Sequence, residues 1–166
     1  MASVVFYFQV HQPYRLRRYS IFDNSASYFD EHNNEQILHK VANKCYLPTN
    51  RLLLDLLRKH EGQFRISYSV TGTVIDQFRQ WAPEVLQSFT DLAETGYVEF
   101  IAETFYHSLS FLYSREEFIL QTQQHCKLME ELFGQHPKIF RNTELTYNND
   151  VAKTVEDMGF DAILSE

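Results

Sequence analysis

The sequence predicts an α/β fold built on a parallel sheet. Short apolar segments rich in Val, Ile, Phe and Tyr alternate with longer segments whose apolar residues recur every three or four positions. Helix-ending glycines such as Gly62 and Gly96 separate several of these segments. Strands that alternate with helices form parallel sheets with right-handed crossovers. A chain of 166 residues is long enough to form one such domain with a substantial core.

Five segments are predicted to be strands. Residues 4–10 (VVFYFQV) are β-branched and aromatic, as is typical of a buried strand, and residues 64–70 alternate apolar and polar side chains. The other predicted strands are residues 97–102, 138–141 and 161–164. Residues 11–31 are polar and aromatic without a period, which predicts a long loop after the first strand.

Five segments have helical spacing. They are residues 35–46, 50–60, 82–95, 115–133 and 149–158. Pro48 is expected to break the chain between the first two, because proline lacks an N–H and disrupts a helix interior. Pro83 suits the first turn of the third helix, and the sequence from Ser114 to Glu117 matches a capping box at the start of the fourth.

Composition excludes several classes of function. The net charge is −7 and no basic run could neutralise phosphates, so a nucleic-acid partner is not expected. Neither a signal peptide nor an apolar run long enough to cross a membrane is found. Cys45 and Cys126 lie on apolar faces of predicted helices and are expected to be reduced core thiols, which favours a cytoplasmic location.

Polar side chains follow most of the predicted strands. They include His11 and Gln12 after the first, Thr71 to Thr73 after the second, Glu103 and His107 after the third, and Asn142 to Glu144 after the fourth. Ligands bind at the carboxyl ends of the strands in parallel α/β folds. Two histidines and several carboxylates from distant parts of the sequence are therefore expected to gather on one rim.

Each of these residues also has a structural interpretation. His11 and His107 could simply hydrogen-bond to nearby backbone, and Glu103 could support the end of its strand. Metal binding is weakly supported, because the sequence has no HxxxH, HExxH or CxxC pattern and leaves only a scattered set of His11, His107 and a glutamate. With five glycines and no glycine-rich loop, nucleotide binding is disfavoured, and no cofactor is predicted.

A sugar is the ligand that this rim suits best. Aromatic rings stack on the apolar faces of sugars, while His, Asn, Gln and Glu side chains hydrogen-bond to hydroxyl groups. Cleaving a glycosidic bond needs two carboxyl groups, one acting as a nucleophile or base and the other as an acid. Glu144, which stands just past the fourth strand, either caps or solvates a loop or lies at the mouth of an active site.

Three segments resemble the first conserved regions of glycoside hydrolase family 57, most closely those of its α-amylase-type members. They are FYFQVHQPYRLRRY (6–19), GYVEFIAETFYHSL (96–109), and FRNTEL (140–145) followed by YNNDVAKTVEDMGFDAILSE (147–166). The resemblance covers essentially the whole chain in order, and the His-Gln-Pro after the first strand is its most specific mark.

The resemblance implies an incomplete (β/α)7 barrel that acts on α-1,4-glucans with retention of configuration. This chain would supply the first four to five β/α units. Glu144 matches the catalytic nucleophile of the family. His11, with Gln12 beside it, and His107 match residues that bind the substrate.

The chain departs from the family in one respect. The general acid/base of the family is an aspartate in a fourth region, which would lie beyond Glu166, and Asp150, Asp157 and Asp161 are poor substitutes because of their places on or near a helix. Residues 1–166 are therefore expected to be the N-terminal portion of a single catalytic barrel and to be inactive alone. The exposed fifth strand would favour self-association.

Three alternatives remain open for the longer protein. A 4-α-glucanotransferase would differ from a hydrolase only in that a sugar hydroxyl, not water, resolves the intermediate. A relative without a catalytic aspartate would bind glucan but not cleave it. A metal-dependent carbohydrate deacetylase on a related barrel would need histidine and aspartate ligands and stoichiometric zinc.

Overall fold

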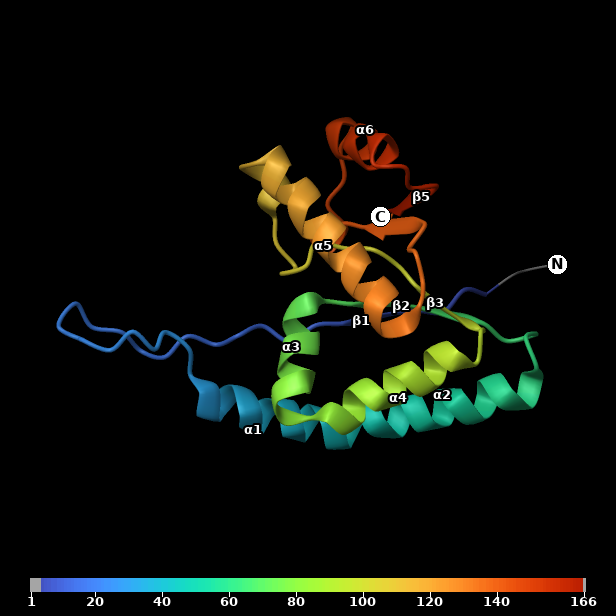
Figure 1. Ribbon diagram of the computed structural model, residues 1–166, viewed down its shortest axis with the longest axis horizontal. Helices are drawn as coiled ribbons and strands as arrows, with labels where there is room; N and C mark the ends of the chain where they lie inside the picture. The colour runs from blue at the N-terminus through green and yellow to red at the C-terminus, as the bar shows by residue number, and fades with distance from the viewer. Residues whose placement is uncertain (1–3, 166) are drawn as a thin grey trace.

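The structure is a computed structural model that describes residues 4–165, and it contains five parallel strands that follow one another in chain order (Figure 1). The strands are β1 (Tyr7–Val10), β2 (Ile66–Val70), β3 (Val98–Phe100), β4 (Ile139–Arg141) and β5 (Ala162–Leu164). Strands β1, β2 and β3 form one sheet, and β4 pairs with β5. The predicted α/β class with parallel strands is confirmed.

A single parallel bridge between Ala102 and Phe140 joins the two sheets. The Ala102 N–H donates to the Ile139 carbonyl at 2.8 Å, and the Arg141 N–H donates to the Ala102 carbonyl at 2.8 Å. The strand order is therefore β1-β2-β3-β4-β5 without a reversal. This order, with helices connecting the strands, is that of part of a β/α barrel.

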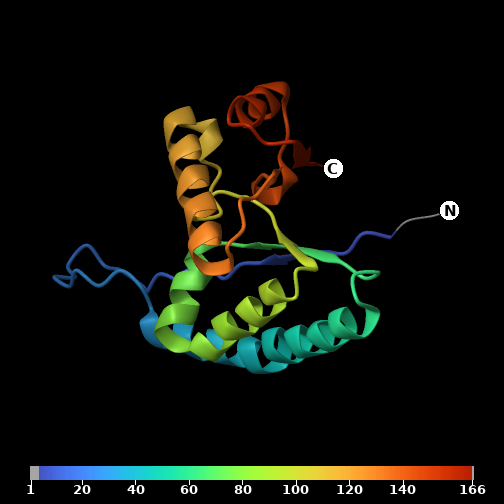
Figure 2. The ribbon, with the colours of Figure 1, turned by 45° about the vertical axis from the view of Figure 1, so that its right-hand side comes forward.

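The helices cover one face of this strand array. They are α1 (Glu31–Val41), α2 (Leu47–His60), α3 (Gly72–Trp81), α4 (Pro83–Glu94), α5 (Arg115–Phe133) and α6 (Asn149–Asp157). Figures 1 and 2 show α1, α2 and α4 beneath the sheet of β1–β3, with α6 on the side of β4 and β5. None of the helices within the described residues is long and apolar enough to cross a membrane.

Two apolar clusters fill the space between strands and helices. The larger one lies between β1–β3 and the helices and includes Tyr68, Phe78 and Phe100. In the smaller cluster, Phe118 of α5 contacts Phe140 of β4 edge to face, with ring centroids 5.4 Å apart. Alternate residues of each strand therefore point toward the helices, as expected for a buried parallel sheet.

The opposite face of the sheet is polar. Because Phe8 and Val10 pack with the larger cluster, Tyr7 and Gln9 point to the other face. There the Tyr7 hydroxyl lies 2.6 Å from the Ser69 hydroxyl of the neighbouring strand. The face that would line a barrel interior thus carries hydrogen-bonding side chains, and its carboxyl edge is where His11 follows β1.

The expected break at Pro48 is wrong. Helix α1 passes into α2 through a π-helical turn, Ala42–Tyr46, and the backbone on both sides keeps right-handed helical angles. The Leu47 N–H donates to the Ala42 carbonyl five residues back. This wider turn lies next to Pro48, which has no N–H to donate, and so the helix continues past the proline.

The π-helical turn also explains the wrong prediction for Cys45. An apolar stripe at regular helical spacing would place Cys45 in the core, but the extra residue of the π turn rotates it outward and leaves it exposed. Cys126 is partly buried and packs beside the smaller cluster, and both thiols are free.

Helix α3 was not predicted. Its sequence opens with Gly72 and several β-branched residues, which have low helix propensity, and no element was predicted between the second strand and residue 82. The Thr71 side chain caps the helix by accepting from the Val74 N–H at 3.3 Å. Gly72 then lies directly beneath the ring of Phe105, whose carbonyl accepts from the Thr73 N–H at 3.3 Å.

We expect Gly72→Ala to lower the free energy of unfolding by about 1–3 kcal/mol, because the new Cβ would overlap the buried ring of Phe105. Urea unfolding measures this change. Gln80→Ala, on the exposed face of the same helix, is the control and should leave stability almost unchanged. Since alanine has the higher helix propensity, a gain in stability for Gly72→Ala would contradict the close packing of Phe105 on α3.

Candidate active site

Three side chains that are far apart in the sequence meet at the carboxyl edge of the strands. His11 follows β1, His107 lies in the loop after β3, and Glu144 lies just past β4. The imidazole rings of His11 and His107 stack with centroids 4.4 Å apart and planes at 29°. Nε2 of His107 is 3.3 Å from Oε1 of Glu144. The two histidines and the glutamate, which were expected to lie together at this edge of the sheet, are in contact in the structure.

Glu103 contacts the opposite nitrogen of His107. Its Oε2 lies 3.0 Å from His107 Nδ1, and its side chain is fully buried. The backbone N–H of Glu103 donates to Nδ1 of the buried His125 at 3.4 Å. His125 in turn faces the Val70 carbonyl through Nε2, at 2.9 Å. His125, which gave no signal of function in the sequence, therefore ties α5 to the ends of β2 and β3.

His11 is held by the start of α3. Its Nδ1 lies 2.9 Å from the Thr71 hydroxyl, the same group that caps the helix. Burial lowers the pKa of His11 from its ordinary value near 6.5 to about 4, and the nearby charge of His107 acts in the same direction. His11 is therefore a neutral imidazole at neutral pH, able to donate or accept a hydrogen bond.

The two glutamines near the site have different positions. Gln9, which was not among the predicted site residues, has its amide nitrogen 3.3 Å from both ring nitrogens of His107. Strand alternation places Gln9 on the same face as His11, and this spacing was the signal available in the sequence. The side chain of Gln12, which was selected, instead contacts the Tyr46 hydroxyl at 3.4 Å and the Arg15 guanidinium at 3.3 Å.

The backbone is strained at both ends of the contact between His107 and Glu144. His107 has φ of 54°, and Glu144 has φ of 52° within a short 3-10 turn, Thr143–Leu145. Such left-handed conformations are unfavourable for residues other than glycine and are concentrated at functional sites. Here they direct the carboxylate of Glu144 outward, so that 73% of its side chain is exposed.

Thr143 anchors this turn to the neighbouring loop. Its hydroxyl donates to the Ser108 carbonyl at 2.9 Å and lies 3.2 Å from the Thr104 hydroxyl. Asn142 adds a hydrogen bond to the Thr146 carbonyl at 3.0 Å. The two Thr143 contacts hold the turn that carries Glu144 against the loop that carries His107, and the Asn142 bond closes the turn itself.

Arg141 is a buried cation on the same face. Arg141 is only 5% exposed, and neither its Nε nor its Nη1 has a hydrogen-bond partner among the described residues. Its charge, like that of Glu103, acts on both Tyr7 and His11. The polar face thus holds one buried charge of each sign below the exposed carboxylate of Glu144.

The geometry does not suit a metal ion. Nitrogen lone pairs lie in the plane of an imidazole ring, so two stacked rings do not direct them at a common point. Within residues 4–165 no group of three or more His, Cys, Asp or Glu side chains is arranged to hold an ion. The ligand set that a deacetylase would need is therefore not assembled by the described part of the chain.

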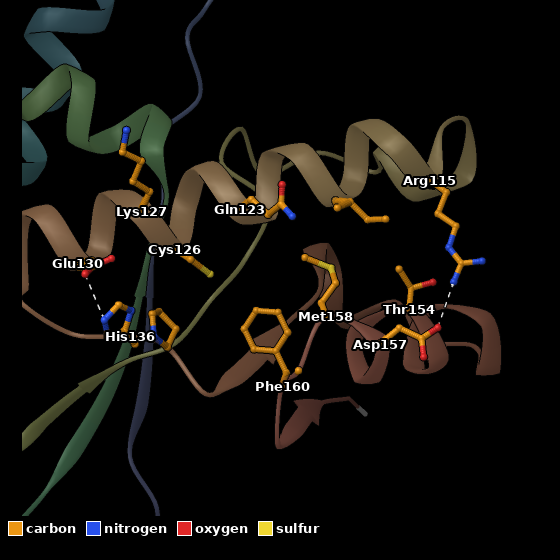
Figure 3. Close-up of a pocket in the computed structure, with 13 residues that line it drawn as sticks. Arg115, Gln123, Cys126, Lys127, Glu130, His136, Thr154, Asp157, Met158 and Phe160 are labelled. Carbon is orange, nitrogen blue, oxygen red and sulfur yellow. Dashed lines mark ion pairs between the residues drawn. The ribbon is translucent and has the colours of Figure 1, made fainter.

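A separate groove lies on the helical side of the molecule. It has a volume of about 860 Å³ between α5 and the segment containing α6 (Figure 3). Ion pairs border it, with His136 Nε2 3.1 Å from Glu130 Oε1 and Arg115 Nη2 3.8 Å from Asp157 Oδ2. None of the residues at the carboxyl edge lines this groove.

Comparison with known proteins identifies relatives of the whole chain. The model of "Glycosyl hydrolase family 57" matches residues 5–166. A curated protein of Methanocaldococcus jannaschii named "Putative alpha-amylase" is 45% identical over 168 residues, which cover 98% of this chain and 35% of the relative. The chain therefore spans about a third of the length of that relative.

Solved structures share the fold. A 4-alpha-glucanotransferase from Thermococcus litoralis superposes with a TM-score of 0.73 at 15% identity, covering 98% of this chain and 22% of that one. A GH57-type branching enzyme from Pyrococcus horikoshii superposes with a TM-score of 0.68 at 16% identity, covering 96% and 41%. At such identities the likeness supports the fold, a portion of a (β/α) barrel.

We expect stability to fall at acidic pH partly through His11. Between about pH 6.5 and 4 the unfolded chain binds a proton at this residue and the folded chain does not, so acid favours unfolding in that range. Replacing His11 with Gln should reduce the loss of stability between pH 7 and pH 5 by on the order of 1 kcal/mol, after allowance for screening at a half-buried side chain. Urea unfolding at the two pH values measures it, and an equal loss in both proteins would contradict the assignment.

Proposed function

Because the chain belongs to glycosyl hydrolase family 57, we propose that it forms part of a retaining glycosidase that acts on α-1,4-glucans, with Glu144 as the nucleophile. The observation that carries the proposal is the position of Glu144. Its carboxylate projects from a strained turn beyond β4, is exposed, and contacts His107 at 3.3 Å. A carboxylate held in this way is open to a sugar and has its orientation biased by His107.

In the proposed reaction, a carboxylate oxygen of Glu144 forms a bond to the anomeric carbon as the glycosidic C–O bond breaks. The leaving oxygen takes a proton from a general acid. Water then adds to the covalent glycosyl-enzyme and releases the sugar with its original configuration. We propose that an aspartate beyond residue 166 is this acid/base, and that the 166-residue chain alone is inactive.

The other rim residues are proposed to bind the sugar. His107 contacts Glu144 through Nε2, and the neutral His11 stacks beside it, so hydroxyl groups of the sugar to be cleaved could hydrogen-bond to both rings. Gln12 is the third proposed binding residue. Its contacts to Tyr46 and Arg15, at 3.4 and 3.3 Å, are long enough to be exchanged for a sugar hydroxyl.

Transfer to a sugar hydroxyl is a close variant of this reaction. A 4-α-glucanotransferase would form the same intermediate on Glu144, and only the acceptor would differ. A non-catalytic glucan-binding protein would use His11, Gln12 and His107 for recognition without the covalent step. No metal or organic cofactor takes part in the proposed chemistry, and the proposed partner is an α-glucan or maltooligosaccharide.

A cytoplasmic location remains part of the proposal. Both cysteines are free, and free thiols are kept in reducing compartments. The net charge of −7 argues against contact with nucleic acid or an anionic membrane surface.

Replacing Glu144 with Gln in the protein as its host produces it should lower kcat on maltoheptaose by about 10³-fold or more, because the amide is a poor nucleophile. Proton NMR measures both the rate and the anomer first released, which should be the α-anomer. Glu116→Gln, an exposed carboxylate in the first turn of α5, is the matched control and should retain the parental rate.

Equally slow rates in the parent and in Glu144→Gln, with the sugar still bound by both, would contradict the catalytic proposal. They would identify a glucan-binding relative in which His11 and His107 serve recognition. Release of the β-anomer first would contradict retention.

A further inference from the structure

Glu103 is a buried carboxylate whose position has no explanation in packing alone. Its side chain is fully buried, yet only Oε2 has a partner, and Oε1 makes no hydrogen bond with the described residues. Burying an ionised group is costly unless its hydrogen bonds are satisfied. A carboxylate retained only for stability would be expected to have both oxygens bonded.

The bonded oxygen of Glu103 faces the ring that also contacts Glu144. Oε2 of Glu103 is 3.0 Å from Nδ1 of His107, and Nε2 of the same ring is 3.3 Å from Oε1 of Glu144. A carboxylate only accepts hydrogen bonds, so the contact with Glu103 places a proton on Nδ1. Since both nitrogens belong to one planar ring, a bond that holds Nδ1 also restricts the direction in which Nε2 points.

We propose that Glu103 is a positioning residue, which holds His107 in the tautomer and orientation that direct Nε2 at Glu144. This inference rests on the proposed role of Glu144 as the nucleophile. With the proton on Nδ1, a bare Nε2 can accept from the Gln9 amide, and when Nε2 also carries a proton it donates to the carboxylate of Glu144. Glu103 acts through His107 and does not touch the substrate.

Hydrogen bonds hold the backbone on both sides of the contact between Glu103 and His107. The backbone N–H of Glu103 is bonded to His125, which is itself fixed by the Val70 carbonyl. His107 lies four residues later in a left-handed conformation, and its N–H donates to the Thr104 carbonyl at 3.0 Å. The contact between Glu103 and His107 closes this strained loop, so that the imidazole is held at both its backbone and its side chain.

Two substitutions separate charge and hydrogen bonding from volume. Glu103→Gln keeps an oxygen that can accept from Nδ1 but removes the charge, and Glu103→Leu fills the same space with no acceptor. In the protein as its host produces it, kcat on maltoheptaose should fall about 10-fold for Gln and about 10²-fold for Leu, with KM changed by less than about 3-fold, because a misplaced group costs rate rather than binding.

A double-mutant cycle tests whether Glu103 acts through His107. In a His107→Asn background the imidazole that Glu103 holds is gone, so the identity of residue 103 should no longer affect the rate. The Glu103→Gln and Glu103→Leu changes should then each alter kcat by less than about 2-fold. A loss that persists undiminished in that background would overturn the proposal, as would parental activity in Glu103→Leu.

Nitrogen-15 NMR of the histidine side chains tests the same proposal without activity. The His107 ring should carry a proton on Nδ1 in the parent protein, and Glu103→Leu should shift both ring nitrogen signals. A bare Nδ1 in the parent protein would overturn the proposal even if every variant failed to fold. If the parent cleaves no glucan, the proposed function fails, whereas the Nδ1 signal still decides the position of His107.

Discussion

The parallel bridge between Ala102 and Phe140 is the contact on which the site depends. Its two backbone hydrogen bonds, each 2.8 Å, join the sheet of β1–β3 to the pair β4–β5. Residues just past the bridge on the two strands are therefore neighbours, which brings the loop holding Glu103 and His107 against the turn holding Glu144. Thr143 reinforces the join through its hydroxyl. Without this register, the two halves of the site would belong to separate sheets.

The site combines buried charge with an exposed reactive group. Glu103 and Arg141 are withdrawn from solvent on the polar face of the sheet, His11 is kept neutral by burial, and the carboxylate of Glu144 projects outward. His107 and Glu144, both in left-handed conformations, lie between the buried charges and the solvent. The start of α3 supports the rim, because Phe105, two residues before His107, packs on Gly72 and the capping hydroxyl of Thr71 lies 2.9 Å from His11 Nδ1.

The five strands and most of the helices could be predicted from the sequence, because they depend on local periodicity. The proximity of His11, His107 and Glu144 could also be predicted, because the carboxyl ends of parallel strands meet at one edge of the sheet. Prediction failed where local rules were overridden. The π turn before Pro48 kept a helix continuous, and the packing of Phe105 on α3 stabilised a helix start of low propensity. The contact of Glu103 with His107 could not be foreseen, since it requires a left-handed conformation at a histidine, which no residue type in that loop signals.

The central claim is that Glu144 becomes covalently bonded to the sugar, and trapping that bond tests it most directly. A 5-fluoro-α-glucosyl fluoride forms a glycosyl-enzyme that hydrolyses slowly, so the labelled protein can be digested and its peptides weighed. We expect a single added 5-fluorohexosyl mass on the peptide that contains Glu144. A label on another carboxylate, or turnover of the reagent with no labelled peptide at any time, would contradict it.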